Sequence, residues 1–169
     1  MKTKEILAYL TIVLIIFGCQ SPKEKRYFHR GGRGGAITKY YFLDKQVIKK
    51  HQIGQADATI YNAEIETDDK DSGVSKEMVL VQCSTSEPFV AIKAFQENNK
   101  IDIRYLNPGG YIYGYMEATH GIYWIVCHDV SLIDDYSLLE KKARDLGYPL
   151  NLEERIIEVP GSDLKQLVK

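Results

Sequence analysis

A succession of short segments rich in β-branched and aromatic residues occupies most of the chain and constrains its fold more than any other feature. In the segment 58–67, Tyr61, Ala63 and Ile65 fall on one side of an alternating pattern, which is typical of a half-buried strand. Glycine and polar runs separate the segments, as expected of turns. The sequence therefore predicts strands over residues 39–50, 58–67, 77–84, 111–118, 122–128 and 155–159.

The segment 89–105 admits two interpretations. Ile101 and Ile103 alternate with polar residues, and the two asparagines that precede them suit a tight turn, so the segment can form a hairpin. The alternative is a short helix that is capped by Ser86 and has Pro88 in its first turn. We favour the hairpin because the alternation is regular.

Residues 131–146 are the best candidate for a helix, because apolar residues recur at helical spacing along one side. Ser131 and Asp134 suit the N-terminus of this helix, and Gly147 suits its C-terminal cap. Strands followed by a helix predict the α+β class. We expect an antiparallel sheet of about six to seven strands with a C-terminal amphipathic helix packed on it.

The chain begins with a basic segment and an apolar run that lead to a cysteine. Lys2 and Lys4 precede the apolar run 6–17, which is shorter than the roughly 20 residues that a membrane-spanning helix needs. Gly18, a small residue, stands directly before Cys19. A basic start, a short apolar run and a small residue before the cut are the marks of an export signal.

This leader resembles the lipobox signal peptide of bacterial lipoproteins. The resemblance implies that residues 1–18 are removed and that Cys19 is acylated, with palmitate among its chains. Several acyl chains anchor a protein stably. Gln20 stands where an aspartate retains such proteins in the inner membrane, which implies the outer membrane, facing the periplasm, in a cell that has one. An ordinary secretory signal or an uncleaved anchor is the alternative.

Residues 19–37 are predicted to form a basic, glycine-rich tether, and residues 38–169 a single globular domain. Glycine-rich, charged sequence buries too little apolar surface to fold. We expect the tether to be a solvated spacer; the alternative is a basic arm held against anionic lipid headgroups. The net charge of the chain is −1, which gives no electrostatic case for a nucleic-acid partner.

The segment 111–128 carries the most suggestive candidate site. If two strands meet at a turn over His120 and Gly121, the alternation of side chains gathers aromatic and ionisable groups on one face. Such a face suits a protein partner or stacking on sugar rings. The alternative, which we weigh more heavily, is that the C-terminal helix covers the face, because an open aromatic face is costly. The candidate binding residues are Tyr111, Tyr113, Tyr115, Glu117, Trp124 and His128.

Cys83 and Cys127 both lie within predicted strands. An exported protein occupies a compartment where disulfides persist, so a disulfide between them is one alternative. Two buried thiols are the other, and we favour them because both residues lie in the middle of a strand. Cys127, His128 and Asp129 are not expected to act as a catalytic group, because neighbours on a strand point to opposite faces.

The sequence contains no phosphate-binding loop, nucleophile elbow or histidine spacing of a zinc site, so we expect no cofactor, metal or catalytic residue. The polar run 68–73 resembles the start of a calcium loop but lacks the later ligands, which favours a turn. We therefore predict a lipid-anchored envelope protein that binds a protein partner, for example an immunity protein that captures a toxin. Alternatives are a glycan- or peptidoglycan-binding module and a hydrolase built around His128 and Glu117.

Overall fold

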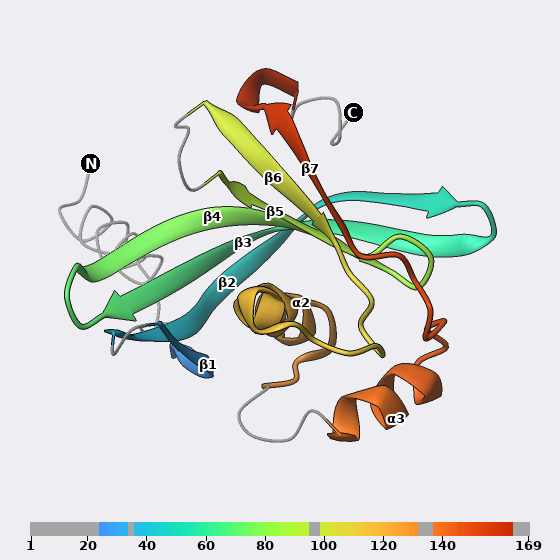
Figure 1. The fold of residues 1–169 in the computed structure, drawn as a ribbon. Helices are drawn as coiled ribbons and strands as arrows, with labels where there is room; N and C mark the ends of the chain where they lie inside the picture. The colour runs from blue at the N-terminus through green and yellow to red at the C-terminus, as the bar shows by residue number, and fades with distance from the viewer. Residues whose placement is uncertain (1–23, 34–35, 95–98, 132–136, 164–169) are drawn as a thin grey trace, which may run out of the picture.

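The computed structural model describes residues 24–33, 36–94, 99–131 and 137–163. Within these residues, seven strands form one antiparallel sheet in which each strand pairs with its neighbours in the sequence (Figure 1). Two helices and a 3-10 turn fall between the last two strands. The elements are β1 (Arg26–Arg33), β2 (Ala36–Ile53), β3 (Ala56–Asp69), β4 (Gly73–Ser84), β5 (Phe89–Lys93), β6 (Lys100–Tyr105), η1 (Gly114–Met116), α2 (Glu117–His128), α3 (Ser137–Asp145), β7 (Arg155–Pro160) and η2 (Gly161–Asp163).

The predicted α+β class is confirmed, and much of the predicted sheet is present. The strands expected from their own patterns correspond to β2, β3, β4 and β7. The segment 89–105 forms the hairpin of β5 and β6, in which Ala91 pairs with Ile103, so the helical alternative is wrong. Local alternation identified these strands because each has one face against a core and one face toward solvent.

The polar run between β3 and β4 is a turn, as predicted. The carboxylate of Asp69 accepts hydrogen bonds from the backbone N–H groups of Asp71 and Ser72, at 3.0 and 2.9 Å. A hydrogen bond from the hydroxyl of Thr38 contributes most to holding the pKa of Asp69 well below its usual range, and the bonds from Ser72 and Asp71 add to it. Gly73 then resumes the sheet at φ 82°, a conformation that residues with a Cβ rarely adopt.

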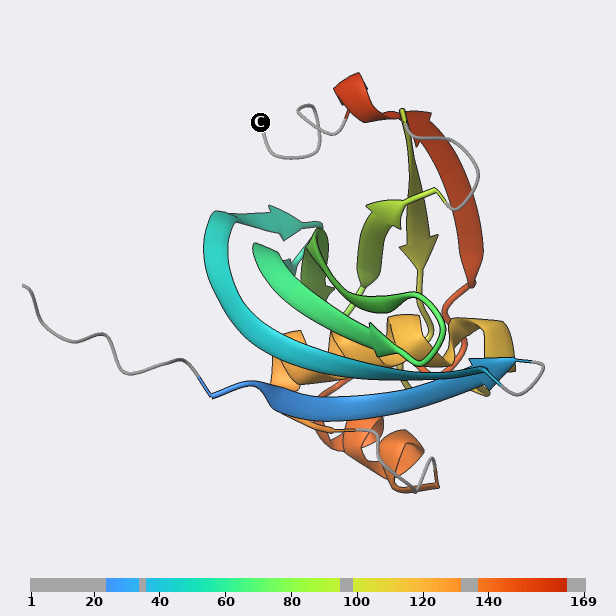
Figure 2. The same ribbon diagram turned by 90° about the vertical axis from the view of Figure 1, so that its left-hand side faces the viewer.

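Residues 117–128 form helix α2, so the predicted hairpin over residues 111–128 is wrong. The segment is rich in β-branched and aromatic residues, which locally favour a strand. Tertiary packing overrides that preference, because α2 lies between the sheet and α3 (Figures 1 and 2) and eight of its 12 residues are buried. Trp124, Tyr123 and Ile125 are at most 1% exposed, and they form the centre of the main core.

Strand β1 occupies residues 26–33 of the predicted tether. Arg26–Arg33 pairs along β2, and even Gly31 and Gly32 have partners there, Thr38 and Ile37. Phe28 is fully buried against α2, which supplies the apolar contact that composition alone did not indicate. The folded domain therefore starts at residue 26 rather than at residue 38.

Two basic residues at the point where the chain enters β1 also contact the rest of the domain. Lys25 forms an ion pair with Glu66 at 2.8 Å and lies over the ring of Tyr41. Arg26 forms an ion pair with Asp129, the residue that follows α2. Lys25 and Arg26 are therefore attached to the folded domain and are not part of a solvated spacer.

Helix α3 packs on the side of α2 that faces away from the sheet (Figure 2). Leu139 and Ala143 are the buried residues of α3, as its predicted apolar stripe requires. The helix ends at Asp145 and Gly147 caps it, as predicted: Gly147 has φ 82°, and the N–H of Tyr148 donates to the carbonyl of Ala143 at 2.9 Å. The predicted start of this helix at 132–136 lies outside the described residues. The helix that packs directly on the sheet is α2, not this later helix.

A disulfide joins Cys83 of β4 to Cys127 of α2, with Cα atoms 5.5 Å apart. The preference for free thiols is therefore wrong, and the alternative of a bridge is correct. That preference assumed two strands, whereas Cys127 lies in the last turn of a helix above β4. The two residues are 44 positions apart, and closing a loop of that size stabilises the fold by about 4 kcal/mol in the chain-entropy account.

Candidate functional site

Three tyrosines form an exposed group where the chain enters α2. Tyr111, Tyr113 and Tyr115 are 79, 52 and 71% exposed. Their rings contact one another in sequence: the centroids of Tyr111 and Tyr113 are 5.1 Å apart, and those of Tyr113 and Tyr115 are 5.9 Å apart. We call these three residues the tyrosine surface. The contacts place each ring against the next, so the three rings have a defined arrangement.

The backbone on both sides of the tyrosine surface is fixed by packing. Met116 is 1% exposed, and its N–H donates to the carbonyl of Tyr113 at 2.7 Å. On the other side, a Cβ atom at Gly109 would lie 2.6 Å from Leu150 and 2.7 Å from Ala143. Only glycine fits at this position, which holds the loop before the tyrosines close to the end of α3.

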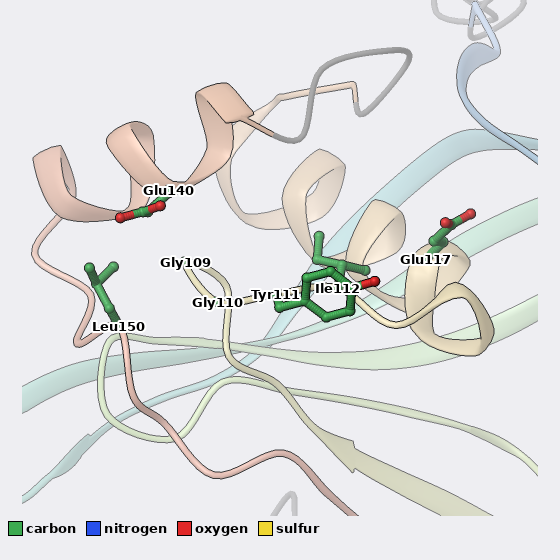
Figure 3. Close-up of a pocket in the computed structure, with 7 residues that line it drawn as sticks. All are labelled: Gly109, Gly110, Tyr111, Ile112, Glu117, Glu140 and Leu150. Atoms are coloured by element: carbon green, nitrogen blue, oxygen red, sulfur yellow. The ribbon is translucent and has the colours of Figure 1, made fainter.

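A pocket of about 640 Å³ lies beside the tyrosine surface. Figure 3 shows that its two carboxylates, Glu117 at the start of α2 and Glu140 on α3, lie at opposite ends and do not point toward each other. Glu140 also forms an ion pair with Arg144 at 2.5 Å. The arrangement suits recognition of a surface more than chemistry between two converging acids. The lining residues are Gly109, Gly110, Tyr111, Ile112, Glu117, Glu140 and Leu150.

The structure divides the six predicted binding residues into two groups. The three tyrosines and Glu117 lie together near the start of α2. Trp124 is fully buried, and its ring centroid lies 5.1 Å from that of His128. Glu117 and His128 are the first and last residues of α2, about 16 Å apart along the helix axis. The single face predicted from a hairpin is therefore wrong, and a hydrolase built around these two residues has no geometric support.

His128, the last residue of α2, belongs to a largely buried network of hydrogen bonds. Its Nε2 atom and the hydroxyl of Tyr148 are 2.6 Å apart, and that hydroxyl is also 2.6 Å from the hydroxyl of Tyr123. The hydroxyl of Tyr123 can donate to the carbonyl of Ser84 at 3.2 Å. Burial lowers the pKa of His128 to about 4, with smaller contributions from nearby lysines, so the ring is neutral at pH 7 and can accept a hydrogen bond from the hydroxyl of Tyr148. This network joins α2, α3's following loop and β4.

The other histidine of α2 has an acidic partner that sequence reasoning missed. Nε2 of fully buried His120 lies 2.9 Å from Oε1 of Glu154. The backbone N–H of Asn107 donates to the same carboxylate oxygen at 3.3 Å. Glu154 is separated from His120 by 34 positions, and no local pattern connects them. The pair ties the segment before β7 to α2, and it does not line the pocket beside the tyrosine surface.

Among the described residues, the groups that a thiol nucleophile or a metal site would need do not lie together. Cys127 is in a disulfide, so its thiol is not available as a nucleophile beside His128 and Asp129. Across the described ranges, no group of three or more His, Cys, Asp or Glu residues is placed to hold a metal ion. Cys19 lies outside the described residues. Of the helices that the structure describes, none has the length and apolar character needed to cross a membrane.

Comparisons of the chain with protein families, with curated proteins and with solved structures found no match.

Proposed function

We propose that this protein is a lipid-anchored lipoprotein of the cell envelope whose folded domain binds a protein partner. The lipobox-like leader that ends at Cys19 supports the anchor. The disulfide between Cys83 and Cys127 independently supports an oxidising compartment, because disulfides are rare in the cytosol. An immunity protein that captures an incoming toxin at the membrane is one concrete form of this function.

The observation that carries the binding function is the tyrosine surface. Soluble proteins rarely leave large aromatic side chains exposed in a contiguous group without a use for them. Tyrosine is enriched at the centres of interfaces, since it supplies a large contact area and a hydroxyl at little cost in side-chain entropy. Tyr111, Tyr113 and Tyr115 are exposed, held in contact with one another and placed on a fixed backbone. The pocket beside Tyr111 can receive a side chain from the partner.

A capture experiment with the full chain tests this function. The protein is solubilised from its membrane in mild detergent, and the proteins that copurify are compared between wild type and a variant carrying Tyr113→Ser and Tyr115→Ser. The matched control is Val74→Ser with Met78→Ser, because these exposed apolar side chains lie on β4 and do not line the pocket beside the tyrosine surface. One partner in stoichiometric amount that is lost with the tyrosine variant and retained with the control supports the proposal. A partner that binds all three proteins equally contradicts the assigned surface.

A glycan-binding function is the second candidate, and one observation favours it. The pocket places the ring of Tyr111 beside two carboxylates, Glu117 and Glu140, and sugars are bound by stacking on aromatic rings together with polar groups. Sedimentation of the protein with purified peptidoglycan tests this function. Cosedimentation that is lost with Tyr111→Ala, in the absence of a protein partner, would support the glycan-binding function over the protein-binding one.

A further inference from the structure

Helix α2 separates two ends of the domain. Its C-terminal end adjoins the start of β1, where Asp129 forms an ion pair with Arg26. Its N-terminal end begins at Glu117, directly after the tyrosine surface. The helix has 12 residues and is therefore about 18 Å long. Figure 2 shows the chain entering β1 at the end where α2 finishes. The tyrosine surface thus lies at the end of α2 opposite to the point of chain entry.

The chain between the proposed anchor and the domain is short. Only residues 20–25 separate Cys19 from Arg26. The seven backbone steps from Cys19 to Arg26 can reach at most about 25 Å when fully extended. Lys25 is already held on the domain by its ion pair with Glu66, which shortens the free segment further. Turning the tyrosine surface to the membrane would therefore require nearly complete extension of the linker.

The end of the domain where the chain enters also carries basic side chains. The Nζ atom of Lys45 donates to the carbonyl of Val126 in the last turn of α2. Lys142 of α3 and Lys45 both act electrostatically on His128, which places them near this end. Arg26 lies there too, and Asp129 balances part of the positive charge. Basic residues close to a bilayer are attracted to its anionic headgroups.

We infer that the anchored protein rests the C-terminal end of α2 and the start of β1 on anionic lipid headgroups and presents the tyrosine surface away from the membrane. The partner is then a protein whose binding region projects into the aqueous space, and not one that offers a lipid-embedded segment. This inference rests on the proposed anchor at Cys19 and on the proposed use of the tyrosine surface. It holds equally for an uncleaved anchor, since that also ends before β1.

Energy transfer from the protein to the membrane surface tests this orientation. The full chain is reconstituted into vesicles of phosphatidylethanolamine and phosphatidylglycerol that contain a headgroup-labelled acceptor dye. A donor dye is attached, without reductant, to a cysteine introduced by Ser131→Cys in one variant and by Gly114→Cys in another. Ser131 lies near the start of β1, where its hydroxyl contacts the carbonyl of Tyr27, and Gly114 lies among the tyrosines. Both positions are exposed, and a Cβ at Gly114 meets no atom closer than 4.0 Å.

We expect strong transfer from residue 131 and much weaker transfer from residue 114, with a difference in height of about 18 Å. Equal transfer from the two positions, or stronger transfer from residue 114, in protein that is bound to the vesicles would overturn the orientation and leave the anchor intact. Protein that does not sediment with vesicles would contradict the anchor, and the inference with it. In vesicles of phosphatidylcholine alone, transfer from residue 131 should decrease; no change would exclude the contribution of the basic side chains.

Discussion

Gly121 of α2 lies against the ring of Phe28 in β1, so closely that a Cβ atom added at residue 121 would be 3.1 Å from two ring carbons. Glycine costs up to about 1 kcal/mol relative to alanine inside a helix, so its presence here requires a reason. The reason is the close approach of α2 to the strand that brings the chain into the domain. Phe28 is fully buried by this contact.

We expect Gly121→Val to destabilise the protein by about 1–3 kcal/mol, because the added methyl groups must displace the Phe28 ring in a close-packed core. Urea denaturation monitored by circular dichroism measures the change in the free energy of unfolding. Gly114→Ala is the control, since its Cβ would meet only open space and one distant carboxylate oxygen. Equal stability of Gly121→Val and wild type would contradict the packing of α2 on β1.

Reduction of the disulfide should lower stability. Replacing Cys83 and Cys127 by alanine removes the covalent link between β4 and α2, and we expect a loss of about 2–4 kcal/mol. The measurement is thermal unfolding with and without a reductant. The wild-type melting temperature should fall when reductant is added, whereas that of the double variant should not change. If the melting temperature of the wild-type protein is the same with and without reductant, the two cysteines are not bridged.

Substitutions at the aromatic residues should separate binding from folding. Tyr113→Ser should change the free energy of unfolding by less than about 0.5 kcal/mol, because the side chain is 52% exposed, but weaken partner binding about tenfold or more. Trp124→Ala should cost about 3–5 kcal/mol, because the indole is fully buried. Chemical denaturation and partner capture are measured on the same two variants. A Trp124→Ala protein that is stable but binds its partner weakly would show that the indole contributes to binding and not to the core.

Acid should destabilise the protein through His128. Its pKa is lowered to about 4 in the folded protein, against 6.5 for an ordinary histidine, so the unfolded chain binds a proton at a higher pH than the folded one. The stability that the fold gains from keeping His128 neutral is fully present above pH 6.5, and it is lost as the pH falls from there toward 4. Allowing for the partial exposure of the ring, we expect a loss on the order of 1–2 kcal/mol.

His128→Gln provides the comparison for this prediction, because glutamine can also accept a hydrogen bond from Tyr148 but does not titrate. The free energy of unfolding is measured by denaturant titration across this pH range for both proteins. Carboxylates such as Asp69 contribute equally to the two curves. The wild-type curve should fall more steeply than the variant curve. Parallel curves would show that the titration of His128 is not coupled to folding.

Elements whose pattern is local could be predicted from the order of their own residues. The alternation in β3 and in the hairpin of β5 and β6, and the glycine that ends α3, each reflect constraints within a few residues. A strand with one buried face alternates whatever lies above it, and a helix end that needs positive φ calls for glycine. The exposed part of the candidate site, Tyr111, Tyr113 and Tyr115, was identified from composition, although on a strand rather than before a helix.

The conformations of β1 and α2 depend on contacts with distant parts of the chain. Glycine-rich β1 is ordered because it pairs with β2 and buries Phe28, and neither contact is visible in its own composition. Residues 119–126 are all buried, so the apolar residues of this segment do not mark a single helical face in the sequence, and burial between the sheet and α3 selects the helix. Because the segment is a helix, Trp124 lies in the core, apart from the tyrosines, and Cys127 lies next to Cys83. Long-range packing, which no local pattern encodes, thus determined which residues lie together in the site.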